Sequence, residues 1–326
     1  MKKIVRTVVI IFLVLIAAVF AIAAYVKMAL PNVGPPPDIK VSITPERVER
    51  GKYLANHVSV CMDCHSQRDW NFYAGPIAEG SFGGGGEKFG KEGGFPGTLY
   101  SKNITPYALH NWTDGEIFRA ITGGETKDGK ALFPLMGYPA YGKMDREDVY
   151  SIIAYLRTLP TNKNEVPERE LDFPLNFLVN TMPSKATLSV RPDTNNAVAH
   201  GQYLVTIARC VECHSKEDKG SVIAGTEFGG GRKFDLPNGT SCYTANITPD
   251  KETGIGSWSE EAFIQCFIQF VNSSNNRRPI GKNDFNTVMP WLMYGGMTSK
   301  DLSSIFAYLQ TVKPIKNKVQ HFVRKS

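Results

Sequence analysis

Two five-residue segments decide the fold of this chain: Cys61-Met62-Asp63-Cys64-His65 and Cys210-Val211-Glu212-Cys213-His214. They share the pattern Cys-x-x-Cys-His, and the second begins 149 residues after the first. With six Cys and six His in 326 residues, chance placement gives roughly 0.002 such patterns per chain. Two copies therefore indicate two sites with the same chemistry.

The sequence around these two segments is also repeated. Asn103-Ile104-Thr105-Pro106 recurs unchanged at 246–249, and Ala154-Tyr155-Leu156 recurs at 307–309. Apolar residues at helical spacing accompany both copies, and no alternating strand pattern stands out. We therefore predict an all-α protein with two homologous domains, a first repeat at 47–160 and a second repeat at 196–313.

The last helix of each repeat carries start signals in the sequence. Asp145 with Asp148, and Thr298 with Asp301, have the spacing of N-cap boxes. Apolar residues follow each pair at helical spacing. We predict that a capped amphipathic helix ends each repeat.

The N-terminal segment predicts export of the chain. Residues 7–26 are uncharged and apolar, and as a helix they would span roughly 30 Å, the thickness of a bilayer core. Three basic residues precede them, which favours a cytoplasmic N-terminus. We predict that residues 1–30 are a single-pass anchor in the cytoplasmic membrane, with the repeats on the periplasmic side. A signal peptide cleaved after Ala21-Ile22-Ala23 is the alternative.

Three further segments flank or join the repeats. Residues 31–46 are predicted to be a Pro-rich spacer, and residues 161–195 a linker packed against the domains. Residues 314–326 form a basic tail, interpreted as solvated, with anionic headgroups or an acidic partner as alternatives. The net charge of +6 arises at the two chain ends, because the repeats are balanced. This distribution argues against nucleic-acid binding.

Cys-x-x-Cys-His is the pattern of covalent c-type haem attachment. Two thiols on one helical face can each add to a porphyrin vinyl group, and the histidine beside them can bind the iron. We predict two covalently bound haem c groups, held by Cys61, Cys64 and His65 and by Cys210, Cys213 and His214. A zinc site joining the cysteine pairs is disfavoured, because zinc ribbons separate their pairs by roughly 15–20 residues. A redox dithiol would not require the histidine.

Methionines are the matched candidates for the sixth iron ligand. Met136 and Met289 occupy equivalent repeat positions and are predicted to be the thioether ligands. Met144 also has a matched counterpart, but it precedes a helix N-cap and can pack as a hydrophobic staple. Met144 and Met293 remain the alternative ligands.

Filled axial positions predict electron transfer rather than catalysis. Histidine and methionine together raise the reduction potential and leave no open position for oxygen or peroxide. We therefore predict an electron carrier or electron-transfer subunit, not an enzyme, whose partners are redox proteins. The alternative is a dihaem peroxidase or sulfur-compound oxidase in which one axial ligand is displaced.

Other polar residues allow two interpretations. Cys242 and Cys266 have no counterpart in the first repeat, and form either a disulfide or two separate thiols. His57 and His200 do not match in the repeat and are interpreted as ordinary surface or helix residues. Six repeated side chains either donate to haem propionates or form turns and caps: Asn103, Thr105, Trp112, Asn246, Thr248 and Trp258.

The chain resembles the membrane-anchored dihaem cytochromes c. This family is similar to the cytochrome c subunits of bacterial alcohol and gluconate dehydrogenases. The resemblance is carried by Arg50-Gly51-x-Tyr53-Leu54, by 246–258 and by Met289-Pro290-Trp291. It implies two tandem class I cytochrome c domains, each a small helical bundle around a haem. It also implies a relay from a dehydrogenase or quinol donor to a downstream cytochrome or oxidase. One departure is Gly137, which follows Met136 where the family has proline.

Overall fold

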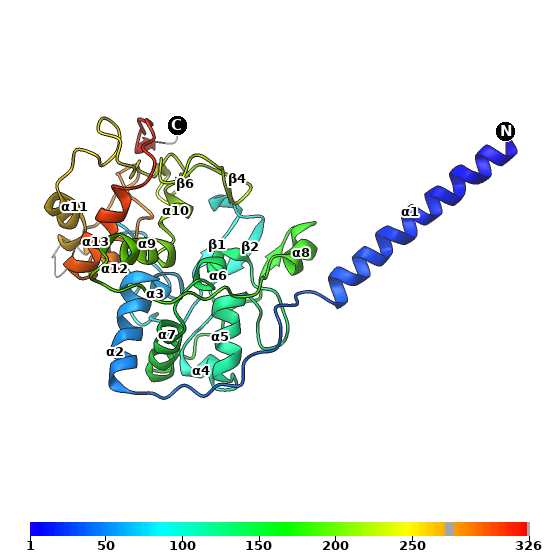
Figure 1. The fold of residues 1–326 in the computed structure, drawn as a ribbon, viewed down its shortest axis with the longest axis horizontal. Coiled ribbons are helices and arrows are strands. Elements are labelled where there is room, and N and C mark those ends of the chain that lie inside the picture. Colours follow the sequence, from blue (N-terminus) through cyan, green and yellow to red (C-terminus); the bar gives the residue numbers. More distant parts are fainter. Residues whose placement is uncertain (271–276, 325–326) are drawn as a thin grey trace.

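The computed structural model describes residues 1–270 and 277–324. Residues 271–276 of the second repeat, and Lys325 and Ser326 of the predicted basic tail, lie outside the described residues. Helix α1, Lys2–Met28, projects away from the rest of the chain (Figure 1). Within the described ranges, it is the one helix long and apolar enough to cross a membrane.

Two crossing helices form the frame of each repeat. In the first repeat, α2 (Pro45–Tyr53) crosses α7 (Arg146–Thr158), and in the second α9 (Ala197–Ile207) crosses α13 (Ser299–Leu309). Gly51 on α2 lies so close to α7 that a side chain would overlap the Ser151 carbonyl oxygen. Gly201 on α9 meets the Ser304 carbonyl in the same way. Glycine is needed at both positions because no other residue lets the backbones approach so closely.

Shorter helices complete the two repeats. The first repeat and the linker contain η1 (Leu54–Val58), α3 (Cys61–Cys64), η2 (Lys91–Gly93), α4 (Pro106–Leu109), α5 (Asp114–Gly123), η3 (Pro134–Met136), α6 (Tyr138–Tyr141), α8 (Leu175–Leu178) and η4 (Val179–Thr181). The second repeat contains α10 (Cys210–Cys213), α11 (Glu260–Ile268) and α12 (Trp291–Tyr294). One continuous cluster of buried apolar side chains runs through both repeats.

Short strands show that the expectation of an all-α protein is wrong in detail. In the first half β1 (Lys88–Phe89), β2 (Gly97–Tyr100) and β3 (Glu170–Leu171) form an antiparallel sheet in that order. The second half has the equivalent sheet β6 (Lys233–Asp235), β7 (Thr240–Tyr243) and β8 (Phe322–Arg324), and a hairpin of β4 (Glu217–Asp218) and β5 (Ser221–Val222). Strands this short are too brief to show a period of two in the sequence.

The structural equivalence of the halves extends beyond the terminal helices. The backbone N–H of Asn162 donates to Thr105 Oγ1, and that of Ile315 donates to Thr248 Oγ1, both at 3.1 Å. Strand β3 in the linker and strand β8 in the tail then close the two sheets. The interpretation of the tail as solvated is therefore wrong for Phe322–Arg324.

The linker follows the surface of the first repeat. The N–H of Ser184 donates to Gly123 O at 3.2 Å, and the N–H of Thr187 donates to Gly142 O at 2.8 Å. Val179 is buried, whereas Phe173 is 84% exposed. The apolar residues of the linker are therefore divided between the interior and the surface.

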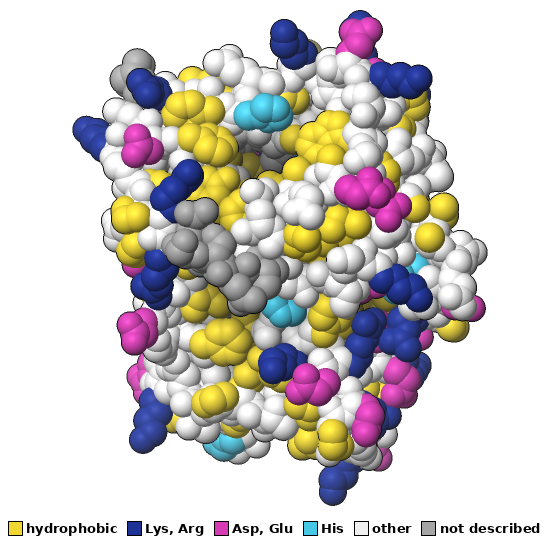
Figure 2. All heavy atoms as spheres, turned by 90° about the vertical axis from the view of Figure 1, so that its left-hand side faces the viewer, with side chains coloured by type: hydrophobic (Ala, Val, Ile, Leu, Met, Phe, Trp, Pro, Cys, Tyr) yellow, Lys and Arg dark blue, Asp and Glu magenta, His cyan; other side chains and the backbone are white. Residues whose placement is uncertain are grey.

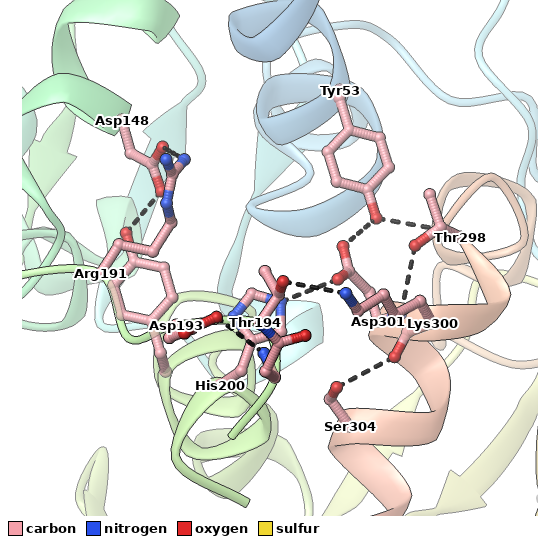
Figure 3. A network of polar contacts seen from close by, with 12 residues as sticks. Tyr53, Asp148, Arg191, Asp193, Thr194, His200, Thr298, Lys300, Asp301 and Ser304 are labelled. Carbon is pink, nitrogen blue, oxygen red and sulfur yellow. Dashed lines mark hydrogen bonds and ion pairs between the residues drawn. The ribbon is translucent and has the colours of Figure 1, made fainter. Parts of the chain in front are cut away.

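Two tyrosines join the repeats reciprocally, and Figure 3 shows one of them, Tyr53, with Asp301 and Thr298. The Tyr53 hydroxyl donates to Asp301 Oδ2 at 2.5 Å, and the Tyr203 hydroxyl donates to Asp148 Oδ2 at 2.7 Å. Each hydroxyl also accepts an N–H from the start of the other repeat's last helix, at 3.1 Å. The first helix of each repeat is thus bound to the last helix of the other.

This interface changes the prediction made for the helix caps. Asp145 accepts a hydrogen bond from the N–H of Glu147, and Thr298 accepts one from the N–H of Asp301, so both N-caps are confirmed. In these two described helices, the side chain three residues after the cap does not accept a hydrogen bond from the N–H of the cap residue. The N–H groups of the two cap residues donate instead to tyrosines of the opposite repeat.

Candidate functional site

Each Cys-x-x-Cys segment forms one helical turn after a left-handed residue. Turn α3 follows Val60, with φ of 45°, and turn α10 follows Arg209, with φ of 60°. Residues three apart on a helical turn share one face, so each pair of thiols points to the same side. All four thiols are free of disulfides.

The thiols have the character of buried neutral groups. Burial raises the pKa of Cys61 and Cys210 to about 12 and that of Cys64 to about 11. Reactive dithiols in redox enzymes have a lowered pKa, because the thiolate is the nucleophile. The direction of these shifts therefore argues against a redox dithiol.

The two histidines are held by the same framework. His65 Nδ1 lies 2.6 Å from Lys102 O, and His214 Nδ1 lies 2.8 Å from Ala245 O. Because a carbonyl only accepts, the ring proton is on Nδ1 and Nε2 keeps its lone pair. Burial lowers the pKa of both imidazoles, which favours the neutral form. Each histidine is therefore prepared to bind a metal through Nε2.

The predicted methionine ligands lie in equivalent segments. Met136 ends the turn η3, and Met289 lies two residues before α12. Both side chains are partly buried against the apolar core. Partial burial leaves part of each thioether accessible to a bound group.

A tyrosine in each methionine segment reaches the segment that precedes the cysteines of the same repeat. The Tyr141 hydroxyl donates to Ser59 O at 3.0 Å, and the Tyr294 hydroxyl donates to Ala208 O at 2.8 Å. These bonds place each methionine segment beside its own Cys-x-x-Cys-His turn. The structure thus brings together residues 82 and 86 positions apart in the sequence.

Met144 and Met293, the alternative ligands, differ in their surroundings. Met144 is fully buried, and its counterpart Met297 is 5% exposed, which fits the predicted packing role. Met293 lies within α12, and its carbonyl oxygen is 2.8 Å from His57 Nδ1. This contact crosses between the repeats, so His57 belongs to their interface.

Within the described part of the chain, two buried polar atoms close in sequence to the candidate ligands have no hydrogen-bond partner. They are the hydroxyl of Tyr138 and Nδ2 of Asn286. Each residue lies within three positions of a candidate methionine. An unpaired buried donor costs about 1–3 kcal/mol, so these donors fit a site completed by a bound group with acceptor oxygens, as haem propionates provide.

The repeated asparagine and threonine pairs form turns. Asn103 Oδ1 accepts from the N–H and the hydroxyl of Thr105, at 2.9 and 2.8 Å, and its Nδ2 donates to Asn162 O at 2.7 Å. Asn246 and Thr248 make the same contacts in the second repeat. Because these side chains are already paired within the protein, the geometry favours the turn interpretation over propionate binding.

The remaining two cysteines do not form a disulfide. Cys242 is buried in β7 and Cys266 lies on α11, and both are free thiols. Burial raises the pKa of each thiol. They are two separate structural cysteines.

Comparison with curated proteins gives relatives along most of the chain. The cytochrome c subunit of the quinone alcohol dehydrogenase of Gluconacetobacter polyoxogenes is 27% identical over 312 residues, covering 91% of this chain and 61% of the relative. The fructose dehydrogenase cytochrome subunit of Gluconobacter japonicus is 29% identical over 290 residues, covering 81% and 52%. A diheme cytochrome c-type protein of Cereibacter sphaeroides is 27% identical over 226 residues, covering 61% and 74%. No protein-family model matches the chain. The resemblance to cytochrome c subunits of dehydrogenases is confirmed.

This cytochrome-like chain is shorter than its dehydrogenase relatives. It spans 61% of the length of the alcohol dehydrogenase subunit and 52% of the fructose dehydrogenase subunit. The diheme relative is matched over a larger share of its own length, 74%. The shared part includes both repeats of this chain in the longest match.

The face of the cytochrome-like chain opposite α1 carries both signs of charge. Figure 2 shows apolar side chains around a hollow on this face, with Lys, Arg, Asp and Glu interspersed around them. A nucleic-acid surface would instead gather basic residues on one face.

Sequence reasoning missed the residues that connect the two sites. Asp301 accepts from Tyr53 and lies 2.8 Å from the buried His200 Nε2, and Arg209 contacts the segment of Met136. Matched Tyr53 and Tyr203, and Asp148 and Asp301, were visible as repeated residues. Their partners were not, because each partner lies in the other repeat.

Proposed function

We propose that the chain is a membrane-anchored dihaem cytochrome c. It would transfer electrons from a dehydrogenase or quinol donor to a downstream cytochrome or oxidase. The observation that carries the proposal is the duplicated site in which His65 and His214 each bind a backbone carbonyl through Nδ1. The relatives named as cytochrome c subunits support it.

The residues divide between attachment and ligation. Cys61 and Cys64 would attach the first haem, and His65 and Met136 would bind its iron. The second set would hold the other haem: Cys210, Cys213, His214 and Met289. The bond of each histidine to a carbonyl fixes the ring orientation and makes Nε2 a stronger ligand.

A bound haem c would supply an iron that accepts and releases one electron. The protein residues around each site would limit how much the protein and solvent rearrange when an electron is gained or lost. Tyr138 is fully buried and Tyr294 is 8% exposed, so both methionine segments lie against apolar surroundings. Excluding water in this way is one of the means by which a protein tunes a haem potential.

Helix α1 would anchor the chain in the cytoplasmic membrane. Its apolar side chains are exposed along its length, and it carries basic residues at its N-terminal end. The proposed orientation puts both repeats in the periplasm, where haem c is attached and redox partners are reached.

Counting covalent haem tests the proposal directly. The full chain is produced in a host that matures c-type cytochromes, and haem is measured on denaturing gels and by the haem-to-protein ratio. We expect two covalent haems per chain. The double substitutions Cys61→Ala with Cys64→Ala, and Cys210→Ala with Cys213→Ala, should each reduce this to one.

Cys242→Ala and Cys266→Ala are the matched controls, because they remove cysteines that lie outside both motifs. Both variants should keep two haems. A wild-type chain without covalent haem would refute the proposal. Peroxide turnover with a high-spin haem would instead favour the dihaem enzyme.

A further inference from the structure

Arg209 connects the second cysteine turn to the methionine segment of the first repeat. It directly precedes Cys210, yet its Nη1 donates to Leu135 O at 3.0 Å. Leu135 is the residue before Met136. The guanidinium also lies 5.9 Å from the ring centre of Tyr141, the tyrosine that ties the same segment to Ser59.

The other edge of the guanidinium is held within its own repeat. Arg209 Nε donates to Glu212 Oε2 at 2.9 Å, and Nη2 contacts the same oxygen. The side chain is only 21% exposed. A planar guanidinium can donate hydrogen bonds from two of its edges at once. A lysine ammonium lacks this forked arrangement of donors. Arg209 is therefore a rigid link between turn α10 and the carbonyl of Leu135.

Arg209 also explains why Gly137 follows Met136 where the resembled family has proline. A Cβ at this position would lie 2.6 Å from Arg209 Nη1. Gly137 has φ of +78°, which any other residue adopts at a cost. In the second repeat, Pro290 follows Met289, and the corresponding residue before the first cysteine turn is Val60, which has no guanidinium to place. The glycine makes room for an arginine of the other repeat.

Arg209 adjoins both proposed haem sites. It directly precedes Cys210 of the second site, and its guanidinium donates to the carbonyl of the residue before Met136 of the first.

We infer that Arg209 is a positioning residue that holds the Met136 segment of the first haem site from the second repeat. Axial ligation at one haem then depends on docking of the repeat that carries the other. The inference rests on the proposed function, in which Met136 is a ligand.

Spectroscopy of the full-length holoprotein in detergent tests this role. Oxidised Met-ligated haem has a sulfur-to-iron charge-transfer band, and Met136→Leu identifies the part that belongs to the first site. We expect Arg209→Ala to lose this same part, leaving about half of the band, and to lower one of the two midpoint potentials. Both haems should stay covalently attached.

Arg209→Lys separates position from charge. It keeps the positive charge but lacks the fork, so we expect the same loss of the Met136-dependent band. Arg232→Ala is the matched control. Arg232 Nη1 donates to Glu212 O at 2.7 Å, so it supplies a cation at the same turn, while its hydrogen bonds stay within the second repeat. This variant should keep the Met136-dependent band.

Two outcomes would overturn the inference about Arg209 without affecting the proposed function. One is a full Met136-dependent band in both Arg209 variants. The other is a full band in Arg209→Lys with a loss in Arg209→Ala, which would show that charge rather than position acts. If Met136→Leu leaves the wild-type band unchanged, Met136 is no ligand, and the ligand assignment of the proposed function fails with the inference. The retained Met289-dependent band reports that a variant is folded.

Discussion

At the scale of single residues, Asp148 carries more of the structure than any sequence signal indicates. Its side chain is 1% exposed and accepts from Arg50 Nε and Nη2, from Arg191 Nη1 and from the Tyr203 hydroxyl. Arg50 comes from the same repeat, Arg191 from the linker and Tyr203 from the other repeat. One carboxylate thus joins three parts of the chain.

Asp148→Asn is expected to destabilise the protein by about 3 kcal/mol, because it removes the buried carboxylate charge and leaves the partly buried Arg50 without its partner. Urea unfolding of the holoprotein measures the change. Glu147→Gln is the control: its carboxylate is 60% exposed and pairs with Arg47 at the surface, so the loss should stay below about 1 kcal/mol. Equal losses in the two variants would contradict the central role of Asp148.

The same carboxylate predicts an acid dependence. Burial alone would raise the pKa of Asp148. The hydrogen bonds and charge of Arg50, together with Tyr203 and Arg191, outweigh this rise, so the pKa lies below its usual value. Its stabilising effect is present above the unfolded pKa of about 3.9 and is lost as the pH falls below that value. Asp148→Asn should therefore show a flatter fall in unfolding free energy below about pH 4 than the wild type.

The residues of the site could be predicted to different extents. Cys61, Cys64 and His65 follow from a local pattern, and the Nδ1 contact of His65 with Lys102 O agrees with a metal-binding role. The contact of Arg209 with Leu135 O could not be foreseen, because its two residues are 74 positions apart and lie in different repeats. Gly137, in place of the proline of the resembled family, was the one feature of the sequence that pointed to this contact.

At the scale of elements, the crossing of the first and last helices is the main packing contact of each repeat. Gly201→Ala is expected to cost about 1–3 kcal/mol or more, because the new methyl group would overlap the Ser304 carbonyl and force the helices apart. Gly51→Ala should have a similar effect at Ser151. Thermal unfolding followed by circular dichroism measures both.

Lys52→Ala provides the control for these glycine variants. Lys52 is exposed on α2, next to Gly51, so its loss should change the free energy of unfolding by less than about 0.5 kcal/mol. If both glycine variants are as stable as Lys52→Ala, the helices do not cross as closely as described.

The long helices were predictable from periodicity, and the small sheets were not. Helices α7 and α13 have Asp145 and Thr298 as their N-caps, as the sequence signals predict. Strand β8 is three residues long and lies in a segment that reads as a basic tail. Its pairing with β7 depends on the long-range bond between Ile315 and Thr248, which no local pattern shows.

At the scale of the whole molecule, the reciprocal tyrosines make the two repeats one unit. Tyr53→Phe and Tyr203→Phe should each cost about 2 kcal/mol, because each removes a hydrogen bond to a carboxylate. In the double variant we expect the unfolding transitions of the two repeats to separate. Tyr107→Phe, at an exposed tyrosine, should leave a single transition.

The same hydroxyls predict an alkaline dependence. Burial and the bond to Asp301 raise the pKa of Tyr53 above its usual value, and burial and the charge of Asp148 do the same for Tyr203. Their stabilising effect is complete below the unfolded pKa of about 10 and is lost as the pH rises above it. The double phenylalanine variant should therefore lose less stability above pH 10 than the wild type. Equal alkaline profiles would show that the tyrosines do not couple the repeats.

The anchor makes a final prediction at this scale. Val26 is the buried residue of α1, and the other side chains along the helix are exposed, so the fold of the repeats gains little from it. Replacing residues 1–26 by a cleavable export signal should therefore give a soluble periplasmic protein with unchanged haem content and unfolding midpoint. Membrane fractionation and the haem-to-protein ratio measure this result. A wild-type chain in the soluble fraction would show that the segment is a cleaved signal, whereas a truncated chain that lost haem would show that α1 supports the fold.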